Sequence, residues 1–437
     1  MRVGRRWSGL WLLLAATGMP LGAQAQPAEP DIADPFGAAQ ADTGPKPLRL
    51  TLGQEGSLYT QRDHGVVNNR SSFRLEYATL LQDGFFVQLD TKLNAYWGSD
   101  HRARAAGSSA LFETRTPEAF VQYSAPGGTS SVKLGIQRLI WGESEAGAIT
   151  DVVSPRDLSE LFLIPLEESR IGQFMVVADH FSPAGDWTGF FVPEAKFNKL
   201  PRPGTAYYVD PFAGQATLRD DPASLDKREV GVRWKRTFNS SDVALMLASV
   251  LDNDHVLRLD GASDDGRLLL SSTARRYTMG GMSFNHARGR FLFKGELAYK
   301  ASKAFNDTGF GIVERDVVEG SLGVTHPLAQ ADTLNVELVN SRVRDWSPQI
   351  AGMPRNTTSL VLNATFFYLN DRLSVNWLTV ATHPYQALQS SLRSSYKSSD
   401  NLTFGLDVHA IRANDPRSGL YGVRDRGQVV LRAQYQF

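Results

Sequence analysis

The sequence closes with Gly427-Gln428-Val429-Val430-Leu431-Arg432-Ala433-Gln434-Tyr435-Gln436-Phe437. The residues at positions 429, 431, 433, 435 and 437 are apolar, whereas most of the residues between them are Gln or Arg. Successive side chains of a β-strand point to opposite faces, so this segment would present an apolar face to lipid and a polar face to water. The pattern predicts the closing strand of an outer-membrane β-barrel, whose terminal Phe the barrel-assembly machinery recognises. An edge strand of a soluble β-sandwich is the alternative.

The other end of the sequence has the features of a secretory signal peptide. Three Arg residues precede an apolar run over 10–16, and Ala23-Gln24-Ala25 forms a cleavage site with small residues. The run is too short to cross a membrane as a helix. The following residues are rich in Pro, Ala, Asp and Gly, a composition typical of flexible chain. We therefore expect a signal peptide over 1–25, a flexible periplasmic tail over 26–46 and a barrel over 47–437.

The composition narrows the class of protein. The sequence has no Cys, and its 46 basic residues balance 46 acidic ones. Cleavage of the signal peptide would remove three Arg and leave 43 basic residues, so a basic nucleic-acid-binding surface is excluded. The mean hydropathy is modest, as expected when only half of each strand faces lipid, and a helical membrane protein would be far more apolar.

Alternating segments separated by turns continue through the whole chain. The clearest is a hairpin in which the apolar alternation of 85–97 follows the tight turn Asp83-Gly84. Seven further short turns are predicted at 126–128, 182–186, 239–241, 288–289, 330–332, 369–371 and 398–401. Between them lie longer polar connections at 61–71, 98–112, 142–169, 193–227, 252–273, 302–313, 344–355, 383–386 and 413–424.

Short and long connections alternate strictly, as in outer-membrane barrels with short periplasmic turns and long external loops. The pattern predicts an all-β, antiparallel, up-and-down transmembrane barrel of about 18 strands (16–18) in the outer membrane of a Gram-negative bacterium. A soluble sandwich or propeller is the alternative, but we find no blade-length repeat. Aromatic residues near the strand ends also favour the two girdles of a membrane barrel.

We find no pattern that predicts catalysis. The eight His residues are scattered, and no metal-binding spacing or phosphate-binding Gly loop is present. We therefore predict no enzymatic activity, no catalytic or metal-binding residue and no cofactor. A membrane hydrolase assembled from residues distant in sequence is kept as an alternative.

The charged residues of the strands share one predicted face. An unpaired charge in the lipid midplane costs roughly 2–4 kcal/mol, so this face must line a wet interior. A barrel of this size is wide enough for an aqueous channel unless a loop narrows it. The predicted lumen residues are Arg74, Glu76, Asp90, Lys92, Lys133, Glu229, Arg233, Lys235, Lys294, Glu296, Lys300, Glu319, Glu337, Arg393, Lys397, Asp407 and Arg432.

The connection over 142–170 differs from the other loops. Ser154-Pro155 is a typical N-cap and first position of a short helix, and we expect a helix to begin there. The apolar run over 158–164 needs burial, which requires the loop either to fold inward onto the lumen wall or to pack as a cap on other external loops. If it folds inward, its charges would narrow the pore. The predicted constriction residues are Lys133, Gln137, Glu143, Arg156, Asp157, Glu167, Glu168 and Arg170.

One part of the sequence carries a family resemblance. Gly135-x-Gln137, Trp141-Gly142-Glu143, Asp151 and 154–157 resemble a signature of uncharacterised proteobacterial outer-membrane barrel proteins, a family distantly similar to alginate-export porins. The resemblance implies a channel across the outer membrane and suggests work beside an inner-membrane export pump.

The predicted function is thus passage of a solute or exported molecule through a polar lumen. A barrel that moves lipid-like or hydrophobic compounds with such a pump is the second alternative. The expected partners are outer-membrane lipid and lipopolysaccharide and the barrel-assembly machinery, with no nucleic acid.

Overall fold

The computed structural model describes residues 48–61, 65–97, 112–144, 149–203, 205–220, 226–328 and 331–437. The predicted signal peptide over 1–25 and the predicted tail over 26–46 lie outside these ranges, as does most of the predicted loop 98–112. The statements below concern the described residues.

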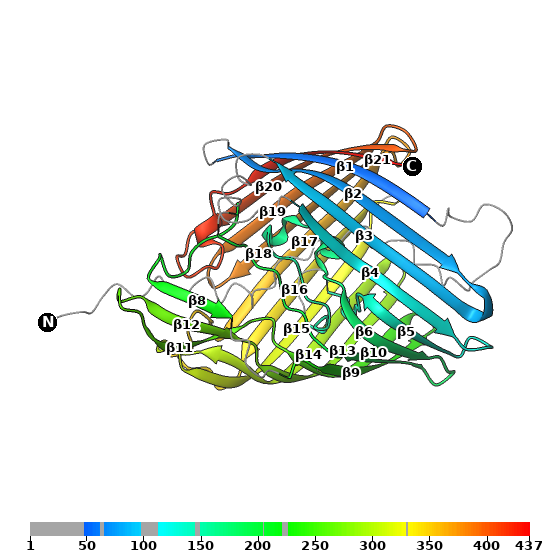
Figure 1. Cartoon of the computed structure of the whole chain (residues 1–437). Coiled ribbons are helices and arrows are strands. Elements are labelled where there is room, and N and C mark those ends of the chain that lie inside the picture. The colour runs from blue at the N-terminus through cyan, green and yellow to red at the C-terminus, as the bar shows by residue number, and fades with distance from the viewer. Residues whose placement is uncertain are drawn as a thin grey trace.

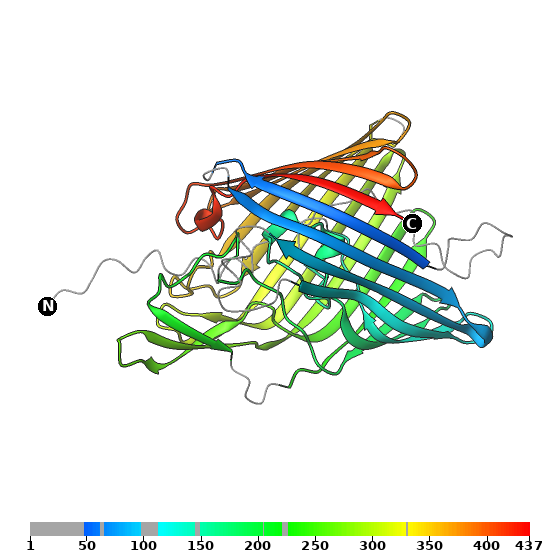
Figure 2. The same ribbon diagram turned by 45° about the horizontal axis from the view of Figure 1, so that its top comes forward.

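The strands form one closed antiparallel barrel of 18 strands. Neighbours in sequence are neighbours in the sheet, and β1 pairs with both β2 and β21, which closes the ring (Figures 1 and 2). The predicted fold class is confirmed. The strands are β1(Leu48–Tyr59), β2(Val66–Leu80), β3(Phe85–Trp97), β4(Phe112–Ser124), β5(Ser130–Gln137), β6(Gln173–His180), β7(Asp186–Val192), β9(Glu229–Phe238), β10(Ser241–Leu251), β13(Arg276–Arg288), β14(Phe291–Asn306), β15(Ile312–Pro327), β16(Thr333–Val343), β17(Asn356–Tyr368), β18(Leu373–His383), β19(Ala387–Lys397), β20(Leu402–Ala413) and β21(Gln428–Gln436).

Short and long connections gather at opposite ends of the barrel, and the short turns lie where the sequence predicts them. Two long loops are shorter than predicted. β2 already begins at Val66, β14 continues to Asn306, and β15 begins at Ile312. The reason is that polar residues within 66–71 and 302–313 continue the strand ladder.

Side-chain exposure alternates along the strands as a lipid-facing wall requires. In β16, Val336 and Leu338 are 38% and 50% exposed, whereas Glu337 and Val339 between them are 1% and 3% exposed. Outward apolar and inward polar residues therefore follow the period of two that is read from the sequence.

A second small sheet lies beyond the long-loop end of the barrel and was not predicted. It consists of β8(Ala216–Asp220), β11(Val256–Ala262) and β12(Leu268–Thr273), and β8 pairs in parallel with β12 (Figure 1). Leu257, Leu270 and Phe212 form its core. The sequence predicts two separate polar loops, 193–227 and 252–273, and the sheet forms because the two loops pair with each other.

The barrel wall is low at β5, β6 and β7, which have 8, 8 and 7 residues, compared with 16 in β14 and β15. β4 pairs with β5 only from Ala119 onward, so its first residues pair with β3 alone. Pro117, which lacks an N–H group, lies in this one-sided stretch, where a missing donor costs least. Gly172 fits against it because a Cβ there would lie 2.1 Å from the Pro117 carbonyl oxygen.

Helical structure is scarce, and no helix in the described ranges is long and apolar enough to cross a membrane. The helix predicted from Ser154-Pro155 is wrong. The Ser154 hydroxyl instead bonds to the backbone N–H and carbonyl of Leu139, and the chain continues extended, with bridges at Arg156 and Asp157. The short helix α2(Leu166–Ser169) begins later, after Pro165.

A large apolar cluster occupies part of the barrel interior. Its wall residues include Met175, Phe190, Met246, Met279 and Val361, which point inward from β6, β7, β10, β13 and β17. The loop residues Trp141, Ile149, Val152 and Val153 complete the cluster. The predicted polar inner face is therefore correct for only part of the wall.

Candidate functional site

The connection between β5 and β6, called loop 138–172 below, touches opposite sides of the barrel. Its residue Thr150 bonds to Glu296 of β14, and its residue Glu160 forms an ion pair with Arg70 of β2. β2 and β14 lie nine strands apart in either direction around the 18-strand ring. Both wall residues point inward, so loop 138–172 bridges the interior.

Glu296 is the anchor on the β14 side. Its carboxylate accepts hydrogen bonds from the backbone N–H groups of Glu143 and Ser144, and from the N–H and hydroxyl of Thr150 at 3.0 and 2.7 Å. Glu337 of β16 accepts a further bond from the Ser144 hydroxyl. One wall carboxylate thus satisfies four donors of an otherwise irregular loop, and such buried donors are costly to leave unpaired.

The wall opposite Thr150 makes room for the loop. A Cβ added at Gly281 of β13 would lie 2.9 Å from the Thr150 methyl carbon. Any larger residue at this inward position would push the loop away from Glu296. Gly281, by leaving space, and Glu296, by hydrogen bonding, therefore both determine the position of Thr150.

A buried charge cluster holds the middle of the loop together. Asp151 accepts hydrogen bonds from Arg156 at 3.1 Å and from Arg170 at 3.0 and 3.1 Å, and its side chain is 3% exposed. Burial opposes ionisation, but the two guanidinium groups outweigh it and hold the pKa of Asp151 below its ordinary value. The cluster ties the middle of loop 138–172 to its C-terminal end.

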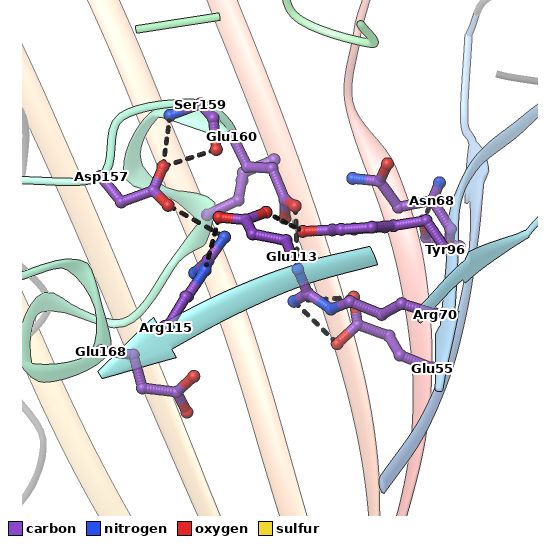
Figure 3. Close-up of polar contacts among 12 residues, drawn as sticks. Glu55, Asn68, Arg70, Tyr96, Glu113, Arg115, Asp157, Ser159, Glu160 and Glu168 are labelled. Atoms are coloured by element: carbon purple, nitrogen blue, oxygen red, sulfur yellow. Dashed lines mark hydrogen bonds and ion pairs between the residues drawn. The ribbon is translucent and has the colours of Figure 1, made fainter. Parts of the chain in front are cut away.

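Four charged residues form a closed ring where the loop meets β4, and Figure 3 labels three of them, Glu113, Arg115 and Asp157. Arg115 lies 3.2 Å from Glu113 and 2.9 Å from Asp157, and Lys199 contacts both carboxylates, at 3.2 Å in the case of Asp157. Tyr96 of β3 donates a hydrogen bond of 2.8 Å to Glu113. We call these residues, Glu113, Arg115, Asp157 and Lys199, the four-charge ring. It joins two loops to the part of β4 that lacks a second strand.

Two further ion pairs attach the loop to β2 and β3. Arg70 lies 2.9 Å from Glu160 and 3.0 Å from Glu55 of β1. All three side chains are labelled in Figure 3. Lys92 lies 3.1 Å from Glu168, and this lysine lowers the pKa of Glu168 to about 2. Residues 160–168, called the loop tip below, are thus attached to β2 and β3 through ion pairs.

In the apolar run over 158–164, Leu158, Leu163 and Ile164 are buried, and the run packs partly on other loops. Leu163 joins a cluster with wall residues such as Val67 and Ile411 and with the loop residues Tyr207 and Leu420. Both arrangements considered from the sequence therefore contribute, because the loop contacts the inner wall and the external loops.

A cavity of about 240 Å³ lies beside the tip of the loop. Pro165 and Glu168 form its loop side, and the wall of β17 to β21 forms the rest. Most of the wall groups are polar. They come from Thr365, Ser374, Asn376, Arg393, Ser394, Ser395, Thr403, Phe404, Gly405, Arg432 and Gln434.

The structure separates the predicted constriction residues into groups. Arg156 and Arg170 belong to the Asp151 cluster, Asp157 to the four-charge ring, and Glu168 to the cavity. Gln137 is buried against Met175, Lys133 lies 6.0 Å from the Phe120 ring on the inner wall, and Glu143 contributes its backbone to the Glu296 anchor. The side chain of Glu167 lies outside the described part of the structure.

The predicted lumen residues all lie on the inward-facing positions of their strands. Several form ion pairs there, among them Arg74 with Asp90 at 2.7 Å and Arg432 with Asp407 at 2.7 Å. Lys92 and Arg393 contact loop 138–172, Arg233 bonds to the carbonyl of Ile140, and Lys397 is exposed at the end of β19. Lys294 and Glu296 lie on the β14 wall.

Sequence reasoning missed Glu113, Arg115, Asp151, Glu160 and Lys199 as part of the site. Most of their partners are distant in sequence, and only Asp151 carried a sequence signal, because it belongs to the family signature quoted above. In the described residues, no group of three or more His, Asp or Glu side chains could hold a metal ion.

Comparison with known families identifies the chain. Residues 86–437 match the family described as "Protein of unknown function (DUF1302)". The chain belongs to this family. The match extends well beyond the short signature in the sequence, and it supports the predicted resemblance to an uncharacterised family. No curated protein matches the sequence.

Solved structures of porins have the same fold. The barrel matches OccK8 (OprE) of Pseudomonas aeruginosa with a TM-score of 0.55 and 10% identity, over 89% of this chain and 97% of that one. It matches OccAB1 of Acinetobacter baumannii with a TM-score of 0.53 and 10% identity, over 89% and 95% of the two chains. It matches Pseudomonas aeruginosa OpdK, solved with vanillate, with a TM-score of 0.51 and 10% identity, over 89% of this chain and 98% of that one. These similarities show a porin-type barrel and are not specific to alginate-export porins.

Proposed function

We propose that this DUF1302 protein is an outer-membrane channel in which loop 138–172 narrows the passage of a small polar solute. The observation that carries the proposal is that the loop contacts Glu296 of β14 and Arg70 of β2, on opposite sides of the ring. On the apolar side the loop fills the space against the wall. On the polar side it leaves the cavity of about 240 Å³. The solute path therefore runs between the loop tip and the wall of β17 to β21.

The test is to shorten the loop and measure conductance. Replacement of residues 145–166 by a short Gly-Ser connection should leave the barrel folded, because the strand ladder does not include these residues. Single-channel conductance in planar bilayers should rise severalfold, and larger neutral solutes should pass. A matched control removes the β11–β12 hairpin, which lies beyond the barrel rim, and it should leave conductance unchanged. A folded loop variant with wild-type conductance and solute cut-off would refute the constriction.

The pairing of charges suggests which predicted residues influence passage. Arg156 and Arg170 are 11% and 6% exposed and bond to Asp151, so we assign them to folding of the loop. Glu168, Arg393 and Arg432 line the cavity, and charges at a constriction act directly on a passing solute. Neutralising a cavity residue should change ion selectivity more than neutralising Arg156 in any variant that folds.

We further propose that the short turns face the periplasm and the long loops face outward, as in porin-type barrels. An epitope tag inserted after Gly214, in an exposed turn of a long loop, should be labelled on intact cells. The same tag after Ser240, in the short β9–β10 turn, should be labelled only after the outer membrane is opened. The reverse pattern would invert the topology.

The alternative functions fit the interior less well. A barrel for lipid-like compounds needs an open apolar path, but the loop residues Trp141, Ile149, Val152 and Val153 fill the apolar part of the interior. We propose no enzymatic activity for this porin-type barrel. Contact with lipopolysaccharide, recognition of the last strand by the assembly machinery and cooperation with an inner-membrane export pump remain proposals, to be examined by co-purification.

A further inference from the structure

Two arginines of the cavity wall are incompletely paired. The described structure shows one hydrogen bond for the Arg393 side chain, from Nη2 to the backbone carbonyl of Leu163, and no carboxylate within ion-pair distance. Arg432 bonds to Asp407 through Nη2 at 2.7 Å. The Nε atoms of Arg393 and Arg432 are both buried without a hydrogen-bond partner. Because these Nε atoms have no exposed surface, a ligand in the cavity would bond to the remaining Nη groups of the two arginines.

Gly405 of β20 leaves room for the Arg432 guanidinium beside the cavity. β20 lies between β19 and β21, and its residue Gly405 stands directly opposite Arg432. A Cβ at Gly405 would lie 3.1 Å from the Arg432 Nε atom, so a side chain there would compete with the guanidinium for space. Arg393 stands opposite Asp407, two residues further along β20, so the two arginine backbones are about 10 Å apart across the sheet and about 7 Å apart along the strands. Two guanidinium groups can thus approach one small ligand from both sides.

The charges at the cavity favour a ligand with a single negative charge. Asp407 bonds to Arg432 and stands opposite Arg393 in the strand ladder, so the two arginines share one carboxylate, and Lys92 pairs with Glu168. The charged groups around the cavity therefore carry one net positive charge. A planar guanidinium fork matches the two oxygens of a carboxylate. Hydroxyl and amide groups of Ser374, Thr403 and Gln434 lie nearby to bind polar substituents.

We propose that the cavity between Arg393 and Arg432 is a binding site for a small monocarboxylate on the solute path. The inference rests on the proposed channel function and names the class of solute that the channel prefers. A volume of about 240 Å³ fits an organic acid of modest size. Because Arg393 also holds the Leu163 carbonyl, a bound carboxylate competes with the loop tip for the same guanidinium.

The experiment measures how benzoate blocks chloride current through single channels in planar bilayers. Benzamide, which has nearly the same shape and no charge, and inorganic phosphate are the comparison solutes. Wild-type protein should be half-blocked by a benzoate concentration at least about tenfold lower than that of benzamide or phosphate, since hydrogen bonds to charged groups are the strong ones. If wild-type channels are blocked equally by benzamide, or more strongly by phosphate, the carboxylate site is refuted without any variant.

Three variants locate the site. Arg393→Gln should raise the half-blocking concentration of benzoate about tenfold or more, and Arg393→Lys should give a smaller increase, because it keeps the charge and loses the fork. Arg372→Gln is the matched control. It removes an exposed arginine that bonds to turn carbonyls at the same end of the barrel, outside the cavity, and should change the value less than twofold. Wild-type block in a folded Arg393→Gln variant would refute the assignment.

The design separates failure of the site from failure of the channel. Conducting channels without a preference for benzoate would refute the site and keep the channel. If the wild-type protein conducts no ions, the channel is refuted, and equilibrium dialysis of radiolabelled benzoate with detergent-solubilised barrel decides the site. Binding that is lost in Arg393→Gln would support it, and absence of wild-type binding would overturn it.

Discussion

The two sides of the barrel interior hold loop 138–172 by different physical means. From β6 to β18, inward apolar residues such as Met246 and Met279 pack with Trp141 and Val153 of the loop. From β19 around to β4, the loop is attached by ion pairs and by the apolar contacts of Leu163, and the cavity lies beside it against β17 to β21. Apolar packing is non-directional and fills space, whereas ion pairs fix a few points and leave water-accessible gaps. We therefore propose that the apolar half of the interior supports the loop and that solute passes through the polar half.

The largest expected difference between the two sides is in stability. Met279→Ala removes a fully buried side chain from the apolar cluster and should lower the free energy of unfolding by about 2–5 kcal/mol. Gln434→Ala, on the cavity wall of the polar side, should change it by less than about 0.5 kcal/mol. Urea-dependent folding into phospholipid vesicles measures both. Equal losses would show that the polar side is packed as a core.

The anchor on β14 should matter more than its counterpart on β2. Glu296→Ala leaves three backbone N–H groups of the loop without an acceptor, which should cost about 2–4 kcal/mol of loop attachment. Glu160→Ala should cost about 1 kcal/mol or less, since Arg70 keeps Glu55 at 3.0 Å. Limited proteolysis of the folded barrels should cut the loop faster in the first variant only. Similar protection in both would contradict a principal anchor at Glu296.

The four-charge ring should contribute a smaller and salt-dependent amount. Lys199, whose side chain is 26% exposed, contacts both carboxylates of the ring. Lys199→Met should therefore cost about 0.5–1 kcal/mol at low ionic strength, and 1 M KCl should remove most of the difference from wild type. The loss of stability in Met279→Ala is the reference, because it comes from apolar packing and should not depend on ion pairing. A Lys199→Met effect that persists in high salt would indicate packing of the lysine stem.

The smallest expected effect concerns pH. Lys92 lowers the pKa of Glu168 to about 2, so the stabilisation from this pair is complete above the ordinary glutamate value and disappears as the pH falls toward 2. Loop attachment should thus be unchanged between pH 7 and pH 5 and weaken below about pH 4. Glu168→Gln should lack this acidic transition. Channel recordings at stepped pH test it, and a transition near pH 6 lost in Glu168→Gln would contradict the assigned pair.

The sequence alone determined the barrel and its order of strands. Alternation such as that of 85–97, together with the turns at Asp83-Gly84 and 398–401, predicted the wall, because side-chain period and turn chemistry are local properties. In the structure, Arg74 and Arg432, which are far apart in the chain, occupy inward-facing positions of β2 and β21. The helix predicted at Ser154-Pro155 was wrong because a non-local contact overrides the local signal. The Ser154 hydroxyl bonds to the Leu139 backbone instead of capping a helix.

Only the tertiary structure decided what the inward residues do. Thr150 and Glu296 are 146 positions apart, and Leu163 and Arg393 are 230 apart, so their contacts exist only after the barrel closes in its particular register. Closure also brings one apolar sector of the wall beneath the loop and leaves another sector polar. A strand pattern specifies which face a residue occupies. Which residues meet across the interior depends on strand order, shear and the path of one loop, and these are properties of the whole ring.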